Sequence, residues 1–455
     1  MRRFRLPSGG LFQHPDFMKL WSAETISQFG TAVSQLAIPL VAIIILKASA
    51  FEVALLGTLE FLPFLLFTLP AGVWVDRLPR RAILIVGDLG RAALLATIPI
   101  AYAFDAITLW QLYLVGFLTG IFTVFFDVAY QSYLPALVER DQLVEGNSKL
   151  EISRSGAQLA GPAAAGGLIG LITAPYAILV DSISFLGSAA FVFRIRKREQ
   201  PREKHTEGPK PKMRHELWEG LRYVVTHPYL RPQAMSTGTA NFFTSASFAI
   251  FLVFAVRELH MSPGEIGLAF GLGNIGWLVA ALITNRVQRI LGVGMTTIIG
   301  TVLSPIAGLV YAFAPASFPL PFLIAGGILF GLAAVMYNIT QVSLRQAITP
   351  QRIQGRMNSV MRFIVWGTIP LGQLMGGVLG STIGLRETLF VGAAGSSLAV
   401  LPIVLSPIRS LREMPEPEEV LPTIVAGEGG LASPVGGVDT TGATAGAGPA
   451  AATDR

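Results

Sequence analysis

Long stretches without a single charged side chain constrain this chain more than any other feature of its sequence. Seven such runs lie at 25–46, 106–126, 155–180, 232–256, 290–344, 363–385 and 388–408. A bilayer core of about 30 Å is crossed by about 20 residues of α-helix. Most runs therefore hold one membrane span, and the run at 290–344 has room for two, with a turn at 314–319. Charged residues make up 14% of the chain, against roughly 25% in soluble domains, so a membrane protein is indicated.

Together with shorter apolar stretches, these runs predict an all-α membrane protein with twelve transmembrane helices. The predicted spans are 17–46, 51–75, 82–103, 107–135, 148–172, 174–194, 230–256, 263–285, 293–313, 319–345, 356–383 and 386–407. The segment 195–229 is polar and proline-containing, as expected of a linker. The segment 411–455 is rich in Gly, Ala, Pro and Thr, which predicts a disordered tail.

Part of the linker is predicted to form a short interfacial helix over 215–226. Its apolar residues are spaced to share one helix face, which would lie along the membrane surface. They are Leu217, Trp218, Leu221, Val224 and Val225.

The distribution of Lys and Arg predicts the orientation. If both termini lie on one side, 28 of the 34 Lys and Arg residues share that side, only Lys47, Arg257 and Arg386 lie on the other, and three lie inside spans. Basic residues favour the cytoplasmic side. This bias predicts a multi-pass protein of the plasma membrane with both termini cytoplasmic, and it explains the net charge of +6 without nucleic acid.

The two halves of the chain repeat each other. The pair His14–Pro15 recurs as His227–Pro228, an offset of 213 residues, and the glycine-rich stretch 166–170 recurs at 376–380. An even number of spans in each half makes the repeat parallel, an arrangement typical of transporters that rock about a central site. We expect an N-terminal six-helix bundle at 1–194, a cytoplasmic linker at 195–229, a C-terminal six-helix bundle at 230–410 and a cytoplasmic tail at 411–455.

One loop carries a family resemblance. The connection between the second and third spans reads Gly72-Val-Trp-Val-Asp76-Arg77-Leu-Pro79-Arg80-Arg81. It resembles the loop signature of the major facilitator superfamily, with Pro79 where that family usually has glycine. In the signature, glycine permits close helix approach, the carboxylate pairs with a cation, and the basic residues hold the cytoplasmic face.

A second resemblance is to the branch of siderophore exporters of the enterobactin type and macrolide-efflux-like proteins. It covers roughly residues 14–410 and is carried by the stretch 133–150, by Asp88-Leu-Gly-Arg91 and by Asp181-Ser-Ile-Ser-Phe. It implies the major facilitator fold of two pseudo-symmetric bundles, alternating access, and export driven by an ion gradient. Span five also resembles the antiporter motif of drug exporters, with one residue more than usual between its Gly-Pro and Gly-Gly pairs. Its residues are Gly156, Gly161, Pro162, Gly166 and Gly167.

Ionisable residues inside spans need a reason, because each costs roughly 2.5–3.5 kcal/mol on insertion scales. Asp88 and Arg91, three residues apart, favour a structural pair beside the Asp76 loop. The other candidates could form a proton-coupling site, a gate or a structural lock. They are Glu24, Glu60, Asp127, Arg154, Asp181 and Arg362.

Uncharged polar side chains and aromatic rings in the spans are candidates for lining a substrate cavity. The polar candidates are Gln28, Gln35, Asn241, Asn274, Asn338 and Gln341. The aromatic candidates are Trp21, Phe242, Phe243, Trp277 and Trp366. The match Gly271-Leu-Gly-Asn-Ile-Gly276 lies inside a span with no strand before it, so we interpret it as close helix packing and not as a dinucleotide site.

These patterns favour a secondary active transporter, expected to export a drug-like or siderophore-like molecule in exchange for protons. The alternatives are a metabolite importer and a transporter-like membrane sensor without flux. We predict no enzymatic activity, no cofactor, no metal, a small-molecule substrate, a proton gradient and the lipid bilayer as partners, and a monomer.

Overall fold

The computed structural model describes residues 10–75, 77–139, 142–197 and 213–415. Helices dominate the described residues, and eleven of them have the length and apolar composition to cross a membrane. The helix α5 (Leu143–Ile172) is less apolar, because its first half carries Glu145, Lys149, Glu151 and Arg154. With α5 in the fifth position, the order of helices agrees with the twelve predicted spans.

The first half contains six long helices. Besides α5 they are α1 (Pro15–Leu40, continued by a π-helical turn at Val41–Ile45), α2 (Ala50–Val75), α3 (Arg80–Ala103), α4 (Leu109–Leu137) and α6 (Ala174–Phe193). The second half has six span positions, two of which are broken helices. Its elements are α8 (Leu230–Arg257), α9 (Pro263–Gly273), α10 (Ile275–Leu291), α11 (Val293–Ala312), α12 (Leu320–Ile348), α13 (Gln351–Thr382), α14 (Leu385–Ser397) and α15 (Val400–Val404).

Most predicted span boundaries lie within a few residues of the observed helix ends. The largest differences are at polar helix ends, where helices continue beyond the bilayer-sized apolar run. The helix α5 begins at 143 instead of 148, α10 ends at 291 instead of 285, and α13 begins at 351 instead of 356.

The internal repeat extends to individual hydrogen bonds. At the start of α2, the backbone and hydroxyl of Ser49 donate to the Glu52 carboxylate at 2.7 and 2.8 Å, and the Ser49 hydroxyl accepts from the Glu52 backbone at 3.3 Å. Ser262 and Glu265 form the same capping box at the start of α9, at 2.8, 2.8 and 3.3 Å. Such boxes satisfy otherwise unpaired amides of the first helical turn.

The connections before these boxes repeat as well. Lys47 and His260, 213 residues apart, both adopt a left-handed backbone conformation, with φ of 55° and 53°. His14 and His227 both accept backbone amides through Nδ1 at the start of a span, from Phe17 at 3.0 Å and from Tyr229 at 3.2 Å. The repeat seen in the sequence therefore also exists in the folded chain.

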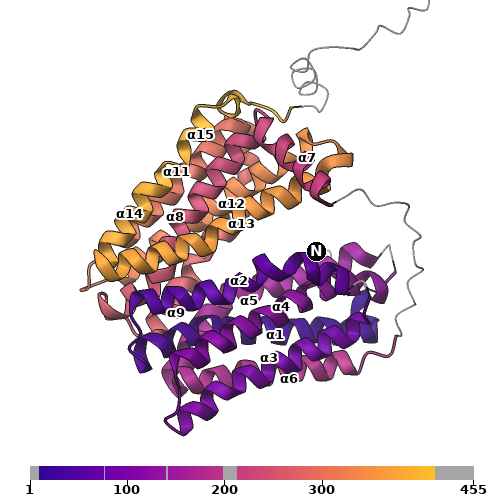
Figure 1. The fold of residues 1–455 in the computed structure, drawn as a ribbon, viewed down its shortest axis with the longest axis vertical. Helices are drawn as coiled ribbons and strands as arrows, with labels where there is room; N and C mark the ends of the chain where they lie inside the picture. The colour runs from indigo at the N-terminus through magenta and orange to yellow at the C-terminus, as the bar shows by residue number, and fades with distance from the viewer. Residues whose placement is uncertain (1–9, 76, 140–141, 198–212, 416–455) are drawn as a thin grey trace, which may run out of the picture.

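Two ends of the molecule must be distinguished. We call the end where α6 ends and α8 begins the linker side, and the opposite end, where α1 connects to α2 and α8 to α9, the loop side. In Figure 1 the helices of the two halves converge on the loop side and diverge towards the linker side. Between the halves, α5 packs on α9 and α2 packs on α13.

The apolar core follows the same division. One buried cluster on the loop side is continuous through both halves and includes Leu40, Leu112, Ile178, Phe254 and Leu389. On the linker side each half has a cluster of its own, around Phe17 and Tyr133 in the first half and around Met357 and Ile403 in the second. The two halves thus share a core on the loop side only.

The helix α7 (Met213–Thr226) begins close to where the interfacial helix is predicted and packs on α13. The prediction of one shared apolar face is wrong for the described side chains. Val224 is buried with the cluster around Met357, whereas Trp218 and Val225 are exposed. The reason is that α7 contacts α13 with its Gly220 face, close to the carbonyl oxygen of Arg356, and so uses only part of its apolar surface. Leu217 lies outside the described side chains.

Candidate functional site between the two halves

The loop-side contact between α5 and α9 is made by glycine backbones. A Cβ atom on Gly166 would lie 2.8 Å from the Cα atom of Gly267, and closer still to the carbonyl oxygen of Pro263. A Cβ atom on Gly267 would meet Gly166 and Pro162 in the same way. This α5–α9 seam, defined by these residues, holds the halves together without interlocking side chains.

The predicted close packing in span five holds for only part of the motif. Gly166 lies in the seam, and a Cβ atom on Gly161 would come within 2.6 Å of the Ala32 Cβ atom on α1. Gly156 and Gly167 have open space where a Cβ atom would point, so close packing is wrong for them. A helix buries only some of its faces, and these two glycines lie on others.

A second seam joins α2 to α13. A Cβ atom on Gly377 would lie 2.6 Å from the Ala54 Cβ atom and 3.1 Å from the Phe51 Cα atom. Further along the same helices, the rings of Phe61 and Trp366 have centroids 6.0 Å apart. The predicted aromatic candidate Trp366 thus stacks against the other half of the chain.

Two hydrogen bonds cross between the halves beside these seams. Arg257 donates to the carbonyl oxygen of Ala48 at 2.6 Å, and the Asn274 amide donates to the carbonyl oxygen of Gln158 at 2.5 Å. Both acceptors are backbone atoms, so these bonds depend on the positions of the helices and not on partner side chains.

A buried arginine organises the charged residues of the first half. Arg91 pairs with Asp88 at 2.6 Å, and the two side chains are 5% and 0% exposed. The Arg91 guanidinium also lies between two rings, 4.3 Å from the centroid of Phe126 and 4.1 Å from that of Phe185. Cation–π contacts of this kind stabilise a cation that has left water.

Four carboxylates from four helices lie within electrostatic range of Arg91. Besides Asp88 on α3 they are Glu24 on α1, Asp127 on α4 and Asp181 on α6. Asp127 also interacts with Arg154 on α5. We call these six residues the Arg91 network. The predicted charge group of Glu24, Asp127 and Arg154 and the predicted pair of Asp88 and Arg91 are therefore one assembly.

The members of the network differ in exposure. Glu24 is buried and accepts a hydrogen bond from Gln28 at 2.6 Å. Asp181 is 1% exposed and accepts from the Ser184 hydroxyl at 3.0 Å. Asp127 and Arg154 are exposed. The network thus runs from a buried interior to side chains that water can reach.

Glu60 and Arg362 stand apart from the network. The Glu60 side chain packs between α2 and α4, where a Cβ atom on Gly116 would lie 2.8 Å from its Cγ atom. Arg362 is exposed on α13, with its guanidinium 4.5 Å from the Trp366 ring centroid. The predicted pseudo-equivalence of Arg362 and Arg154 agrees with their exposed positions on the corresponding fifth spans of the two halves.

The polar cavity candidates do not form one cluster. Gln28 bonds to the Arg91 network, and Asn241 donates to the carbonyl oxygen of Val365 at 3.1 Å. Asn274 lies at the break between α9 and α10 and lines a cavity inside the second half. The three remaining candidates lie elsewhere: Gln35 and Asn338 are exposed, and Gln341 is 8% exposed on α12.

The loop signature lies on the linker side of the first half. Gly72 has open space where a Cβ atom would point, so the predicted close helix approach there is wrong. Asp76 lies outside the described residues, Arg77 is exposed, and Arg80 is half-buried. The expectation that a carboxylate at 76 pairs with a cation therefore stays a prediction.

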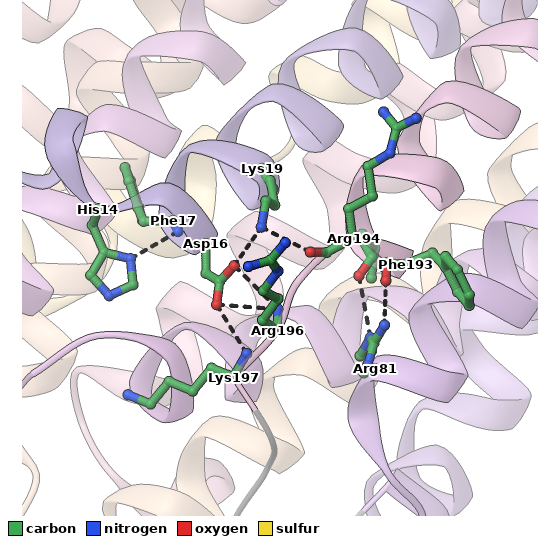
Figure 2. Close-up of polar contacts among 10 residues, drawn as sticks. His14, Asp16, Phe17, Lys19, Arg81, Phe193, Arg194, Arg196 and Lys197 are labelled. Atoms are coloured by element: carbon green, nitrogen blue, oxygen red, sulfur yellow. Dashed lines mark hydrogen bonds and ion pairs between the residues drawn. The ribbon is translucent and has the colours of Figure 1, made fainter.

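Arg81 has a defined structural role at the end of α6. Its guanidinium donates to the carbonyl oxygens of Val192, at 3.3 Å, and Phe193 (Figure 2). Asp16, at the start of α1, accepts from the backbone amides of Arg196 and Lys197 at 3.2 and 2.9 Å. These contacts fix the segment that leaves the first half towards the linker.

Two features of the site were missed in the sequence. Tyr130 lies three residues after Asp127 on the same face of α4, interacts electrostatically with Glu24 and Arg154, and has a buried hydroxyl with no hydrogen-bond partner among the described residues. The Thr25 hydroxyl donates to Ser153 at 2.9 Å and joins α1 to α5. The spacing of Asp127 and Tyr130 was the only available signal for the first feature. In the described part of the chain, no group of three His, Cys, Asp or Glu residues could hold a metal ion.

Comparison with known proteins extends over nearly the whole chain. The family model described as transmembrane secretion effector matches residues 10–424. The multidrug efflux pump Tap of Mycobacterium tuberculosis (strain ATCC 25618 / H37Rv) is 28% identical over 413 residues, covering 88% of this chain and 93% of the pump. Macrolide efflux protein A of Streptococcus pyogenes is 25% identical over 406 residues, covering 88% and 97%.

The fold has a counterpart among solved structures. A bacterial homologue of the iron transporter ferroportin, in an inward-facing state, superposes with a TM-score of 0.70 over 86% of this chain and 98% of the homologue. The sequences are 16% identical, so the likeness concerns the fold alone. Together, the helix arrangement, the internal repeat and the family match identify a membrane transporter and not an enzyme. The chain belongs to the transmembrane secretion effector family, within the efflux branch of the major facilitator superfamily.

Proposed function

We propose that this chain is a proton-coupled exporter of drug-like small molecules, working by alternating access in the plasma membrane with both termini in the cytoplasm. The observation that carries the proposal is the Arg91 network, in which four carboxylates face two arginines. Support for drug-like cargo comes from the relatives named for multidrug and macrolide efflux.

The charge count of the network favours proton binding. With every group ionised, Glu24, Asp88, Asp127 and Asp181 exceed Arg91 and Arg154 by two negative charges. Uncompensated charge inside a membrane protein is costly. Binding a proton relieves the excess, and titration of such closely coupled groups belongs to the network as a whole. Asp127 is the member we assign to proton entry, because it is exposed and contacts both arginines electrostatically.

The two seams supply the movement. Backbone-to-backbone contacts at Gly166 and Gly377 can separate without unlocking interdigitated side chains. On the linker side each half already has its own core, so closing that side would not require either core to be rebuilt. The state described here is thus the one open to the cytoplasm, given the orientation proposed above. Loss of a proton from the network and closure of the linker side would be the linked steps.

The test is transport by inverted membrane vesicles with an imposed pH gradient. Macrolides, siderophores and cationic amphiphiles are offered as cargo, because the sequence resemblance includes both exporter types. We expect gradient-dependent accumulation of at least one amphiphile, and its collapse when a protonophore removes the gradient. Accumulation that is unaffected by the protonophore would contradict proton coupling. No flux for any compound would instead favour the sensor without flux.

Glu60 is the competing site for the proton and gives the decisive comparison. It lies deep between α2 and α4, away from the Arg91 network. We expect Glu60→Gln to retain more gradient-driven transport than Asp127→Asn, with both proteins equally abundant in the membrane. The reverse order would move proton binding from the network to Glu60.

A further inference from the structure

A cavity inside the second half has the chemistry of a binding site for aromatic rings. It has a volume of about 170 Å³ and lies between α8, α9, α10, α11 and α12. Six of its lining residues carry rings: Phe248, Phe251, Phe270, Trp277, Tyr311 and Phe330. Among its lining residues, all of them described, there is no Asp, Glu, Lys, Arg or His.

The rings form a connected wall. Phe251 lies 4.8 Å from Tyr311 and 5.7 Å from Phe270, and Phe330 lies 5.0 Å from Phe248 and 6.4 Å from Trp277, measured between ring centroids. The contacts of Phe330 with Phe248 and of Phe251 with Tyr311 are T-shaped. Edges and faces therefore alternate around the cavity, a surface that prefers another aromatic ring or a cation.

The exposure of the wall shows that the cavity has a closed base and an open rim. Phe251 and Tyr311 are 3% and 7% exposed, whereas Phe248 and Trp277 are 37% and 43% exposed. Protein interiors leave few voids larger than a water molecule. An apolar cavity of about 150 Å³ is large enough to bind benzene, so the space here suits one ring or a small fused system.

Glycines and a helix break create this space. Gly273 and Gly327 lie back to back, since a Cβ atom on Gly273 would be 3.1 Å from the Gly327 Cα atom, and so no side chain fills the cavity from either position. The chain breaks at Asn274 between α9 and α10, and broken spans commonly form binding sites in transporters. The Asn274 amide reaches across to Gln158 on α5, which connects the cavity rim to the interface of the halves.

We propose that this cavity binds the aromatic ring system of the transported molecule, and that it accepts neutral or cationic rings and rejects anionic ones. The inference rests on the proposed function for the word transported, but the binding itself does not depend on flux. The rest of an amphipathic cargo would extend past Trp277 and Asn274 towards the other half.

The experiment measures binding in the full-length protein in lipid nanodiscs, without a gradient. A chain that keeps Trp277 and has the other five tryptophans changed to phenylalanine is titrated with N-methylquinolinium, which quenches indole fluorescence. A reference chain keeps only Trp110, which is 80% exposed in the first half. We expect saturable quenching of Trp277 and linear, collisional quenching of Trp110. Linear quenching of both would overturn the proposal.

Variants locate the probe. Ala269 lines the cavity, so Ala269→Leu should fill it and weaken saturable binding by about tenfold or more. Ala281→Leu, on the exposed face of α10, is the matched control and should leave the affinity unchanged. If Ala269→Leu does not fold, Phe330→Leu removes one ring and should weaken binding less. Unchanged binding in every cavity variant would contradict the assignment.

Competition tests the ligand class. We expect 1-naphthol to displace N-methylquinolinium, and its saturated counterpart decahydro-1-naphthol and the anion 1-naphthoate to fail. Equal displacement by all three would show an unselective apolar void and would overturn the proposal. Saturable binding in a protein without gradient-driven flux would refute the proposed function and leave the binding site standing. Flux without saturable binding would do the opposite.

Discussion

At the scale of single residues, the account depends on which charges meet. The pair Asp88–Arg91 could be predicted from a spacing of three residues on one helix. Its place at the centre of a network could not, because Glu24, Asp127 and Asp181 come from three other helices. A sequence gives the depth of a residue along a span. It gives the rotation of that span about its axis only loosely, and rotation decides which side chains face one another.

His227 gives a prediction outside the spans. Its imidazole is fully buried, and this burial lowers its pKa to about 4, while Nδ1 accepts backbone amides at the start of α8. The unfolded chain binds a proton near pH 6.5 and the folded chain does not. Stability is therefore fully present above pH 6.5 and is lost as the pH falls towards 4, by on the order of 2 kcal/mol at pH 5.

The measurement is thermal unfolding of the purified protein at pH 7.5 and 5.0. His227→Asn keeps a side-chain acceptor for the helix start but has no proton to gain, so its loss of stability between the two pH values should be clearly smaller. His14→Asn, at the equivalent place in the first half, is the control. An equal pH dependence in wild type and His227→Asn would rule out this residue as the cause.

At the scale of helices, the span positions and the repeat could be predicted, because both depend on patterns along the chain. The offset of 213 residues recurs in the capping boxes of Ser49 and Ser262. Helix contacts were less predictable. The glycine of the loop signature, Gly72, and Gly156 in span five have open space around them, whereas Gly166 and Gly267 touch. A glycine motif shows that close packing is possible, and only the fold decides which glycine faces a neighbour.

The α5–α9 seam yields a prediction with a control on the adjacent residue. In Gly166→Ala the added methyl group would overlap backbone atoms of α9, whereas in Gly167→Ala it would meet open space. Overpacking costs about 1–3 kcal/mol, which raises the population of the separated seam on the order of fivefold or more. Gly167→Ala should leave that population unchanged.

The chain has no cysteine, so a single Ala54→Cys can report the opening. Ala54 is fully buried beneath Gly377 in the second seam. Its reaction with a membrane-impermeant thiol reagent, added from the loop side, should be faster in Gly166→Ala than in Gly167→Ala. Equal reaction rates would mean that the two seams do not open together.

At the scale of the whole molecule, the two related halves were predictable and the conformational state was not. Hydropathy and charge patterns are the same in every state of a transporter. The state follows from contacts: one core shared by both halves on the loop side and two separate cores on the linker side. Alternating access predicts that the opposite arrangement is also populated.

Distances between paired spin labels can test this prediction. Cysteines introduced at Val144 and Asn358 report the linker side, and those at Thr173 and His260 report the loop side; all four residues are exposed. Lowering the pH should change the two distances in opposite directions. Two distances that change together, or that do not respond, would be incompatible with rocking of one half against the other.

The central claim is that a proton bound to the Arg91 network drives export, and the most direct measurement is simultaneous proton and substrate flux in proteoliposomes. Wild-type protein is predicted to move protons against substrate. Asp127→Asn is predicted to bind substrate and to lose nearly all gradient-driven flux of both. Glu139→Gln, an exposed carboxylate just beyond the end of α4, serves as the control and should behave as wild type. Substrate flux in Asp127→Asn that remains coupled to protons at the wild-type ratio would contradict the account.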